Sequence, residues 1–286
     1  MKLFKLLFIT SIAAIIWSGC TEDLDMSQIR FEEKLVINAL VTNVENAGVA
    51  VSNTVPVDDS TPPKPLLNCK VKVIDILGNS TNLTYSFVAN KYVGNIKPKA
   101  GEKYVVLVEH PKYGAAQGEF IMPSNPISSP STWKDNTGLD ANGNPTGTIT
   151  CFIKDDGNSR NYYEVNLYRY NDFLADWFQF TPVSNDPEIS ENSITTDLGG
   201  LLLSDKSFNG KTKQISFNTE YASAGNLYKY LVEIKSLSPE YYQYFQSVDA
   251  YENNNSFFPE PQPILSNVIG GRGICAGASV LKDTIR

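Results

Sequence analysis

Apolar and polar residues alternate with a period of two along several short stretches of this chain, and this pattern constrains the fold more than any other feature. Successive side chains of a β-strand point to opposite faces, so the alternation gives each strand one apolar face. The examples are Leu35, Ile37, Ala39 and Val41 in LVINALV, Val71 and Val73 in KVKVID, Tyr104, Val106 and Val108 in GEKYVVLV, Tyr163, Val165 and Leu167 in NYYEVNLYRY, and Tyr228, Tyr230, Val232 and Ile234 in YKYLVEIK. The pattern predicts an all-β fold.

Turn-forming residues separate the strands in the first part of the chain. The segments DDSTPPKP (58–65) and NSTN (79–82) are rich in Asp, Ser, Pro and Asn, which favour turns for different conformational reasons. Short strands with turns between them favour a sandwich of two sheets. We therefore expect residues 31–122 to form an N-terminal β-sandwich of seven strands, immunoglobulin-like or transthyretin-like. The order of its strands is similar to the carboxypeptidase-regulatory type of sandwich.

A composition change marks the middle of the chain. Residues 123–147 are dense in Pro, Ser, Gly and Asn, which is typical of a linker between domains. Strand patterns resume after this segment, and a final strand is expected in GGRGICAGASV. The sequence therefore predicts two β-sandwich domains, with residues 148–286 forming the C-terminal β-rich domain.

One helix is predicted in the second domain, near residues 239–252. Ser238 suits the N-cap position, Pro239 the first helical position, and Glu240 the first turn. Apolar side chains recur at helical spacing at Tyr241, Tyr244, Val248 and Tyr251. We expect this stripe to pack on the second sheet.

The first 20 residues resemble a bacterial lipoprotein signal. Lys2 and Lys5 precede an apolar run, Leu6–Trp17, that is shorter than the roughly 20 residues a membrane-spanning helix needs. Small residues and Cys20 follow. The resemblance implies that residues 1–19 are removed and that Cys20 carries acyl chains, although Trp17 stands where such signals usually have Leu. The alternatives are an ordinary cleavable signal with an incidental cysteine and a short uncleaved anchor.

An acidic tether, residues 20–30, follows the signal. It carries Glu22, Asp23 and Asp25. A cluster in this place resembles the export signal that sends lipoproteins of the Bacteroidota to the outer face of the outer membrane. We therefore expect a chain anchored in the outer membrane and displayed on its extracellular face. The alternative is an acidic tether whose only property is that it is well solvated.

The charge of the chain restricts its partners. Lys2 and Lys5 leave with the signal, so the mature chain has 22 basic and 31 acidic residues and a formal charge of −9. Nucleic acids and anionic lipid headgroups are bound mainly through clustered Lys and Arg, and the sequence has no basic run. We expect neither as a partner.

The residues that carry out catalysis or bind metals are sparse. Three cysteines besides Cys20 are an odd number, and we expect Cys69, Cys151 and Cys275 to be unpaired, although one disulfide is compatible with an oxidising compartment. His110 is the sole histidine, which excludes a site built on two histidines. We predict no catalytic residue, no metal ligand and no cofactor.

Two further sets of residues could form a catalytic or a calcium-binding site, although each signal is weak. Asp155, Asp156 and Glu164 are carboxylates that could pair in the folded chain, as in glycoside hydrolases. Asp140, Asn142 and Asn144 alternate as calcium ligands do, but Pro145 replaces the glycine of such a loop, so a plain turn is favoured.

Four aromatic residues form the candidate interface. Tyr242 and Phe245 share the predicted helix, and Phe257 and Phe258 lie in a segment rich in Pro and Asn. Aromatic side chains in such places suit sugar stacking and protein interfaces. The favoured alternative is that they fill the space between helix and sheet.

Several segments, in a fixed order, resemble a family. They are LVINALV, GEKYVVLVEHPKYGAAQGEFIMP, LLLSDKSFNGK, SPEYYQYFQSV and FFPEPQPILSNVIGGRGICAGAS. Together they resemble a lipoprotein family of the Bacteroidota known as domain of unknown function 4249, over nearly all of the mature chain. Cys275 stands where an aromatic residue is expected and looks like a core substitution.

The resemblance implies a context and no activity, because the family has no established activity. Its members are secreted lipoproteins commonly associated with TonB-dependent outer-membrane receptors. We therefore expect a non-catalytic binding or accessory subunit of such a receptor, with a small ligand that the sequence does not identify. The alternatives are a structural or adhesive cell-surface protein and, less favoured, an enzyme acting on carbohydrate or peptide.

Overall fold

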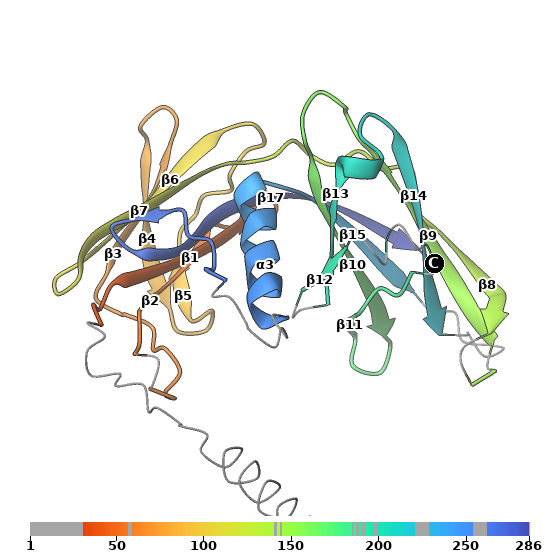
Figure 1. The fold of residues 1–286 in the computed structure, drawn as a ribbon, viewed down its shortest axis with the longest axis horizontal. Coiled ribbons are helices and arrows are strands. Elements are labelled where there is room, and N and C mark those ends of the chain that lie inside the picture. The colour runs from red at the N-terminus through yellow and green to blue at the C-terminus, as the bar shows by residue number, and fades with distance from the viewer. Residues whose placement is uncertain are drawn as a thin grey trace, which may run out of the picture. The chain divides into compact units, whose positions relative to one another are not determined.

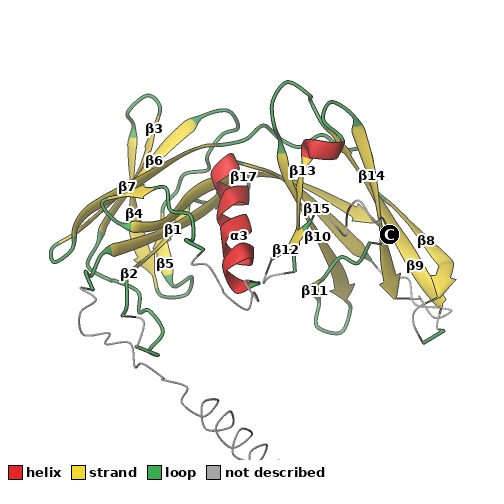
Figure 2. Cartoon of the chain, in the orientation of Figure 1, coloured by secondary structure: helices red, strands yellow, loops and turns green. Residues whose placement is uncertain are grey.

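The structure is a computed structural model, and it confirms the predicted all-β class with one short α-helix (Figure 2). It describes residues 31–285 except for 57–58, 140–141, 144, 185, 187–188, 190–192, 197–198, 221–228 and 254–261. Glu33–Arg286 form one compact unit. Across the described ranges, no helix is both long enough and apolar enough to cross a membrane.

The first part of the unit is the N-terminal sandwich, built on seven strands as predicted. They are β1 (Leu35–Thr42), β2 (Gly48–Asn53), β3 (Lys70–Asp75), β4 (Ser80–Ser86), β5 (Lys91–Val93), β6 (Lys103–His110) and β7 (Gly114–Ile121). Strand β4 turns the corner between the two sheets, because its first half pairs with β3 and its second half with β5. The apolar faces predicted for β1, β3 and β6 all contribute to its core.

Residues from the end of the chain complete this sandwich. Strand β16 (Val268–Ile269) pairs with β7, and β17 (Arg272–Ile285) pairs in parallel with β1. Val268 and Cys275 lie in the N-terminal core. The predicted boundary of the first domain, 31–122, is therefore wrong, because the edge of β1 is closed by a strand more than two hundred residues away in sequence.

The second part of the unit contains two packed sheets. Its strands are β8 (Thr132–Leu139), β9 (Pro145–Lys154), β10 (Tyr162–Asn171), β11 (Asp176–Phe180), β12 (Ile194–Thr195), β13 (Leu201–Ser204), β14 (Thr212–Glu220) and β15 (Tyr230–Leu237), with a short 3₁₀ helix η2 (Asp205–Ser207). The sheet β14-β9-β8 packs on β10 and β15 to form the C-terminal core.

Two sequence expectations in this part need comment. The predicted linker, 123–147, contains β8 and the start of β9. Strand β8 lacks alternating apolar residues and is held by pairing with β9, with Trp133 packed on the C-terminal core. The alternation predicted for β10 and β15 is observed at Val165, Leu167, Val232 and Ile234. Tyr228 lies outside the described residues.

Strand β17 belongs to both parts. Its first half pairs with β1 as far as Thr42↔Ala278, and its second half pairs with β15 from Leu237↔Ala278 onward. Ala278 is therefore the residue at which the strand passes from one partner to the other. One continuous strand crosses the two cores (Figure 1).

The helix α3 (Pro239–Glu252) has the predicted bounds and lies across β17 (Figure 1). The predicted stripe is wrong in part: Tyr241 and Tyr242 are buried, whereas Tyr251 is 60% exposed. The reason is that Tyr242 stacks on Tyr162 with 4.4 Å between ring centroids, which rotates the buried face toward Tyr242. The Ser238 hydroxyl does not cap the helix and instead accepts a hydrogen bond from the Gly277 N–H at 3.2 Å.

Candidate functional site

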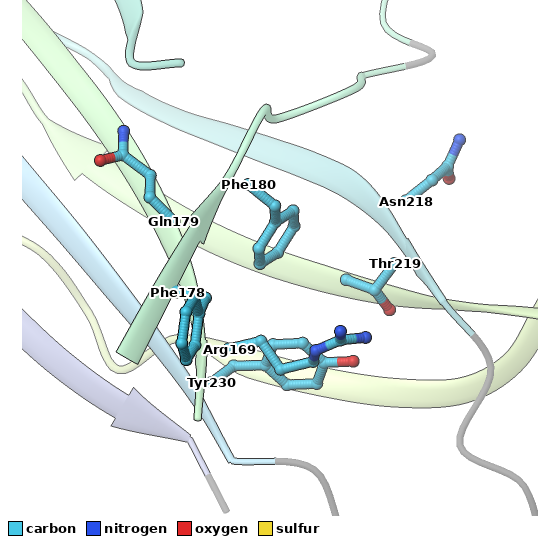
Figure 3. Close-up of a pocket in the computed structure, with 7 residues that line it drawn as sticks. All are labelled: Arg169, Phe178, Gln179, Phe180, Asn218, Thr219 and Tyr230. Atoms are coloured by element: carbon cyan, nitrogen blue, oxygen red, sulfur yellow. The ribbon is translucent and has the colours of Figure 1, made fainter. Parts of the chain in front are cut away.

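An open pocket of about 220 Å³ lies between the two sheets of the C-terminal part (Figure 3). Its lining comes from the end of β10, from β11, from the end of β14 and from the start of β15. The lining residues are Arg169, Phe178, Gln179, Phe180, Asn218, Thr219 and Tyr230. We refer to it as the aromatic pocket.

Aromatic rings form the floor and one wall of the aromatic pocket. Phe178 and Phe180 alternate along β11 and point to the same side (Figure 3). Between ring centroids, Phe180 lies 6.3 Å from Tyr230, and Trp133 lies 5.9 Å from Tyr230. Trp133 donates its indole N–H to Thr219 Oγ1 at 3.2 Å, which fixes the hydroxyl at the pocket. The rings are therefore held in place before any ligand arrives.

Polar groups complete the aromatic pocket. The guanidinium of Arg169 and the hydroxyl of Thr219 lie at the pocket, whereas the side-chain amide of Asn218 points away from it (Figure 3). Gln179 points to the other side of β11, where its Nε2 donates to Asn166 Oδ1 at 2.9 Å. Aromatic faces beside a few fixed polar groups can orient a small ligand that has one apolar ring face. None of these lining residues forms the nucleophile and base pair that covalent catalysis needs.

A buried ion cluster lies on the opposite face of the large sheet, next to α3. Glu164 on β10 and Glu233 on β15 are only 3% and 6% exposed. Lys235 Nζ lies between them, 3.1 Å from Glu164 Oε2 and 3.4 Å from Glu233 Oε1. Lys282 adds a contact of 3.3 Å to Glu233, and Tyr241 donates its hydroxyl to Glu164 Oε2 at 3.0 Å. Every charge in the cluster has an opposite charge within reach.

The phenols around the buried ion cluster stay protonated. Burial, followed by the charge of Glu164, raises the pKa of Tyr241 well above its ordinary value. Burial, followed by the charge of Glu233, raises the pKa of Tyr168 to about 12. A protonated phenol is a hydrogen-bond donor, so Tyr241 holds α3 to the sheet through Glu164. The cluster fastens the helix in place.

The structure does not bring together the three carboxylates considered as a catalytic pair. Asp155 accepts hydrogen bonds from the Gly157 N–H at 3.1 Å and from the Tyr163 hydroxyl at 2.7 Å, among others, and so holds a turn together. Asp156 accepts one from a backbone N–H within its own turn. Glu164 follows Tyr163 on β10 and belongs to the buried ion cluster on the other side of the sheet. These three carboxylates, which the sequence only allowed as a pair, therefore have separate structural roles.

The candidate interface aromatics on the helix are packed inward. Tyr242 is 8% exposed and stacks on Tyr162, and Phe245 packs against Tyr241 with 5.1 Å between ring centroids. They fill the space between helix and sheet, so Tyr242 is not available to a partner. Phe257 and Phe258 lie outside the described residues, as do Cys20, the signal 1–19 and the tether 20–30.

The remaining candidate groups have structural surroundings. His110 is half-buried and stacks on Tyr113 with 4.8 Å between ring centroids. Cys69, Cys151 and Cys275 are unpaired, as predicted. Burial raises the pKa of both Cys151 and Cys275 to about 12, which keeps them as neutral thiols.

A metal site is not formed by the residues that the structure describes. No three His, Cys, Asp or Glu side chains among them lie close enough together to hold an ion. Of the calcium-like alternation, Asp140 and Asn144 lie outside those residues.

Sequence reasoning missed both the aromatic pocket and the buried ion cluster. The segment DWFQF (176–180) signalled an aromatic strand, but nothing local indicates that Thr219 and Tyr230 face it. Charged residues alternate with apolar ones at Glu164, Glu233 and Lys235, a pattern that normally means a solvated strand face. It is buried here because α3 covers it.

Comparison with known proteins places the chain in a family. No curated protein matches it. Similar solved structures include a chitinase from Bacillus thuringiensis (13% identity, 70% of this chain and 29% of that chain, TM-score 0.20) and the BSP domain of a biofilm associated protein (9% identity, 93% of this chain and 61% of that chain, TM-score 0.22). The chain thus spans less than a third of the chitinase, and TM-scores this low carry no argument. The family model described as Domain of unknown function (DUF4249) matches residues 21–284, and the chain belongs to that family.

Proposed function

We propose that this chain is a non-catalytic binding protein, anchored by acyl chains at Cys20 to the outer membrane and displayed on the extracellular face. It takes a small ring-bearing ligand in the aromatic pocket. The observation that carries the binding function is the pocket itself, because three aromatic rings and a guanidinium line one small open space. That set of groups can recognise a ligand and offers no nucleophile and base pair to transform it.

The size of the aromatic pocket limits the ligand. Its volume of about 220 Å³ is below the roughly 300–1,000 Å³ of sites that hold drug-sized molecules. A single ring with hydroxyl groups, such as one monosaccharide unit, matches this volume and the mixture of aromatic faces and polar groups. The rest of a longer ligand would extend into solvent.

Calorimetric titration of the full chain with a panel of neutral monosaccharides tests the pocket. Phe178→Ala, which removes a wall of the pocket, should weaken the binding of any sugar that binds by at least tenfold. Phe173→Ala is the matched control, because Phe173 is 93% exposed on the same β10–β11 hairpin and does not line the pocket. Equal affinities of the two variants would place the ligand elsewhere.

The anchor is supported by the residue order before Cys20 and by the acidic tether. Growth with an alkyne fatty acid should label the wild-type chain, and Cys20→Ser should remove the label. Protease added to intact cells should digest the labelled chain if it faces outward. An undigested chain would place it on the inner face instead.

The proposed partner is a TonB-dependent receptor, to which the chain would be an accessory subunit. This step rests on the family resemblance of the sequence and on the proposed anchor. Affinity purification from solubilised outer membranes should recover such a receptor. Deletion that impairs attachment to surfaces and leaves nutrient uptake intact would favour the adhesive alternative.

A further inference from the structure

Two exposed apolar residues form the tip of the β4–β5 hairpin. Phe87 is 81% exposed and Val88 is 100% exposed. They open the turn 87–90, which the pairing of Ser86 with Lys91 closes. Single exposed apolar residues are ordinary on protein surfaces, so the tip matters only if its support and its position indicate a use.

Several contacts within the β4–β5 hairpin hold its tip in one conformation. Tyr85 packs edge to face against Phe87 at 5.1 Å and against Tyr92 at 5.3 Å between ring centroids. The Tyr85 hydroxyl donates to Asn90 Oδ1, and Asn90 has a φ of 51°, a conformation that residues other than Gly adopt at some cost. The turn therefore holds Phe87 in a fixed outward position, and little conformational entropy remains to be lost when it is buried.

The tip lies at the end of the sandwich where the chain enters. Leu35 pairs with Asn53 at the start of β1, and the Thr54 N–H donates to the Lys34 carbonyl at 2.9 Å. On the other edge of β2, Val49 pairs with Tyr92. Strand β5 runs antiparallel to β2, so the tip before Lys91 lies level with the end of β2, and hence with the start of β1. These three strands can be followed side by side in Figure 1.

The tether limits how far the Phe87–Val88 end of the sandwich can lie from Cys20. Eleven residue steps separate Cys20 from Phe31. A fully extended chain spans at most about 3.5 Å per residue, so the reach is at most about 40 Å. Acyl chains at Cys20 would therefore keep the Phe87–Val88 end of the sandwich near the bilayer.

We propose that the Phe87–Val88 tip inserts into the bilayer that holds the Cys20 acyl chains. This inference rests on the proposed acylation. The acyl chains limit the distance of the protein from the membrane, and the tip would set which end faces it, because a second apolar contact removes free rotation about the tether. Without residues 1–19 the chain has a formal charge of −9, which offers no attraction to anionic headgroups, so the contact depends on apolar burial and is independent of salt.

The β3–β4 hairpin supplies a matched control on the same scaffold. Leu77 is 83% exposed at its tip, and strand β4 joins the two tips, so they lie at opposite ends of that strand. The β3–β4 tip resembles the β4–β5 tip in apolar exposure and differs from it in lying away from the chain's entry. Insertion should therefore occur at Val88 and not at Leu77.

The test uses the acylated full chain in vesicles of phosphatidylcholine and phosphatidylethanolamine, with an environment-sensitive fluorophore on Val88→Cys or on Leu77→Cys. Cys69→Ser removes the one partly exposed cysteine of the described residues, since Cys151 and Cys275 are buried. The fluorophore at 88 should shift to the blue, and doxyl-labelled lipids should quench it at least threefold more than at 77. The difference should persist in high salt.

Three results would overturn the proposal in distinguishable ways. Equal exposure of the two fluorophores to water, in protein whose acylation is verified by the mass of its N-terminal peptide, overturns the inserted tip and leaves the anchor standing. Shielding of position 88 only after outer-membrane proteins are added assigns the tip to a protein partner. An unmodified Cys20 in the exported chain overturns both the anchor and the inserted tip.

Discussion

Lys235 is the residue on which the buried ion cluster depends. It lies within 3.4 Å of carboxylate oxygens of both Glu164 and Glu233, which are almost fully buried. Removing one partner of a buried ion pair leaves an uncompensated charge and typically costs about 3–5 kcal/mol. We expect Lys235→Met to lower the free energy of unfolding by about this amount, measured by urea denaturation.

A surface lysine provides the comparison. Lys229 is 46% exposed and lies 3.7 Å from Asp172, so Lys229→Met should cost about 1 kcal/mol or less. Similar losses for the two variants would show that the cluster is not a tightly coupled unit.

Buried phenols and thiols predict loss of stability in alkali. Burial raises the pKa of Tyr168 from 10.0 to about 12 and that of Cys275 from 9.0 to about 12. At pH values below the ordinary pKa values of these two groups, they are protonated in both the folded and the unfolded chain. They then add nothing to the pH dependence of stability. Above about pH 9 the unfolded chain loses protons that the folded chain keeps, so the free energy of unfolding falls as pH rises toward about 12.

Urea denaturation at several pH values between 8 and 11 measures this dependence. Cys275→Ala should make the decline shallower, because one group that distinguishes the two states is gone. A free energy of unfolding that rises over this interval would contradict the prediction.

At the scale of elements, the contact between β17 and β1 requires a glycine. Gly273 has a φ of 108°, and a Cβ there would collide with the backbone carbonyl of Ile37. We expect Gly273→Ala to cost about 2–4 kcal/mol, the sum of an unfavourable backbone conformation and overpacking. Thermal unfolding monitored by circular dichroism measures the loss.

Gly78 separates the two causes. It has a φ of 83° with nothing within 4 Å of an added Cβ, so Gly78→Ala should cost only about 1 kcal/mol. Equal losses at the two positions would mean that β17 can shift away from β1 without penalty.

Elements with a local signature were predictable from the sequence. Alternation identified β1, β3, β6, β10 and β15, and Pro239 identified the first turn of α3. Strand β8 was missed because TWKDNTGL has no apolar alternation and is a strand through its pairing with β9. The buried face of α3 was misassigned because the stacking of Tyr242 on Tyr162 is a tertiary contact.

The candidate site shows the same limit more strongly. The sequence gives the identity of each lining residue but not their proximity. The aromatic pocket needs Phe178, Thr219 and Tyr230, which come from three different strands. Their assembly depends on how the sheets pair and pack, which the spacing of residues along the chain does not encode.

At the scale of the whole molecule, the two parts should not fold independently. The N-terminal sandwich lacks two of its edge pairings unless β16 and β17 are present. We therefore expect residues 31–122 alone to be unfolded by circular dichroism and hydrogen exchange. Fusing residues 266–279 to them through a flexible linker should restore a cooperative transition.

The same fusion carrying Gly273→Ala provides the control, since its added strand cannot lie flat against β1. A cooperative transition in residues 31–122 without any added strand would show that β17 is dispensable for the first core.

The parallel pairing of Val36 with Arg272 also fixes an order in time. Synthesis delivers β1 more than two hundred residues before β17, so the apolar face and open edge of β1 have no permanent partner until β17 is made. Contacts between residues this distant in sequence form slowly. A strand that is still unpaired during that time is prone to aggregate. Such a chain should depend on a chaperone that holds its first strands until the last one is available.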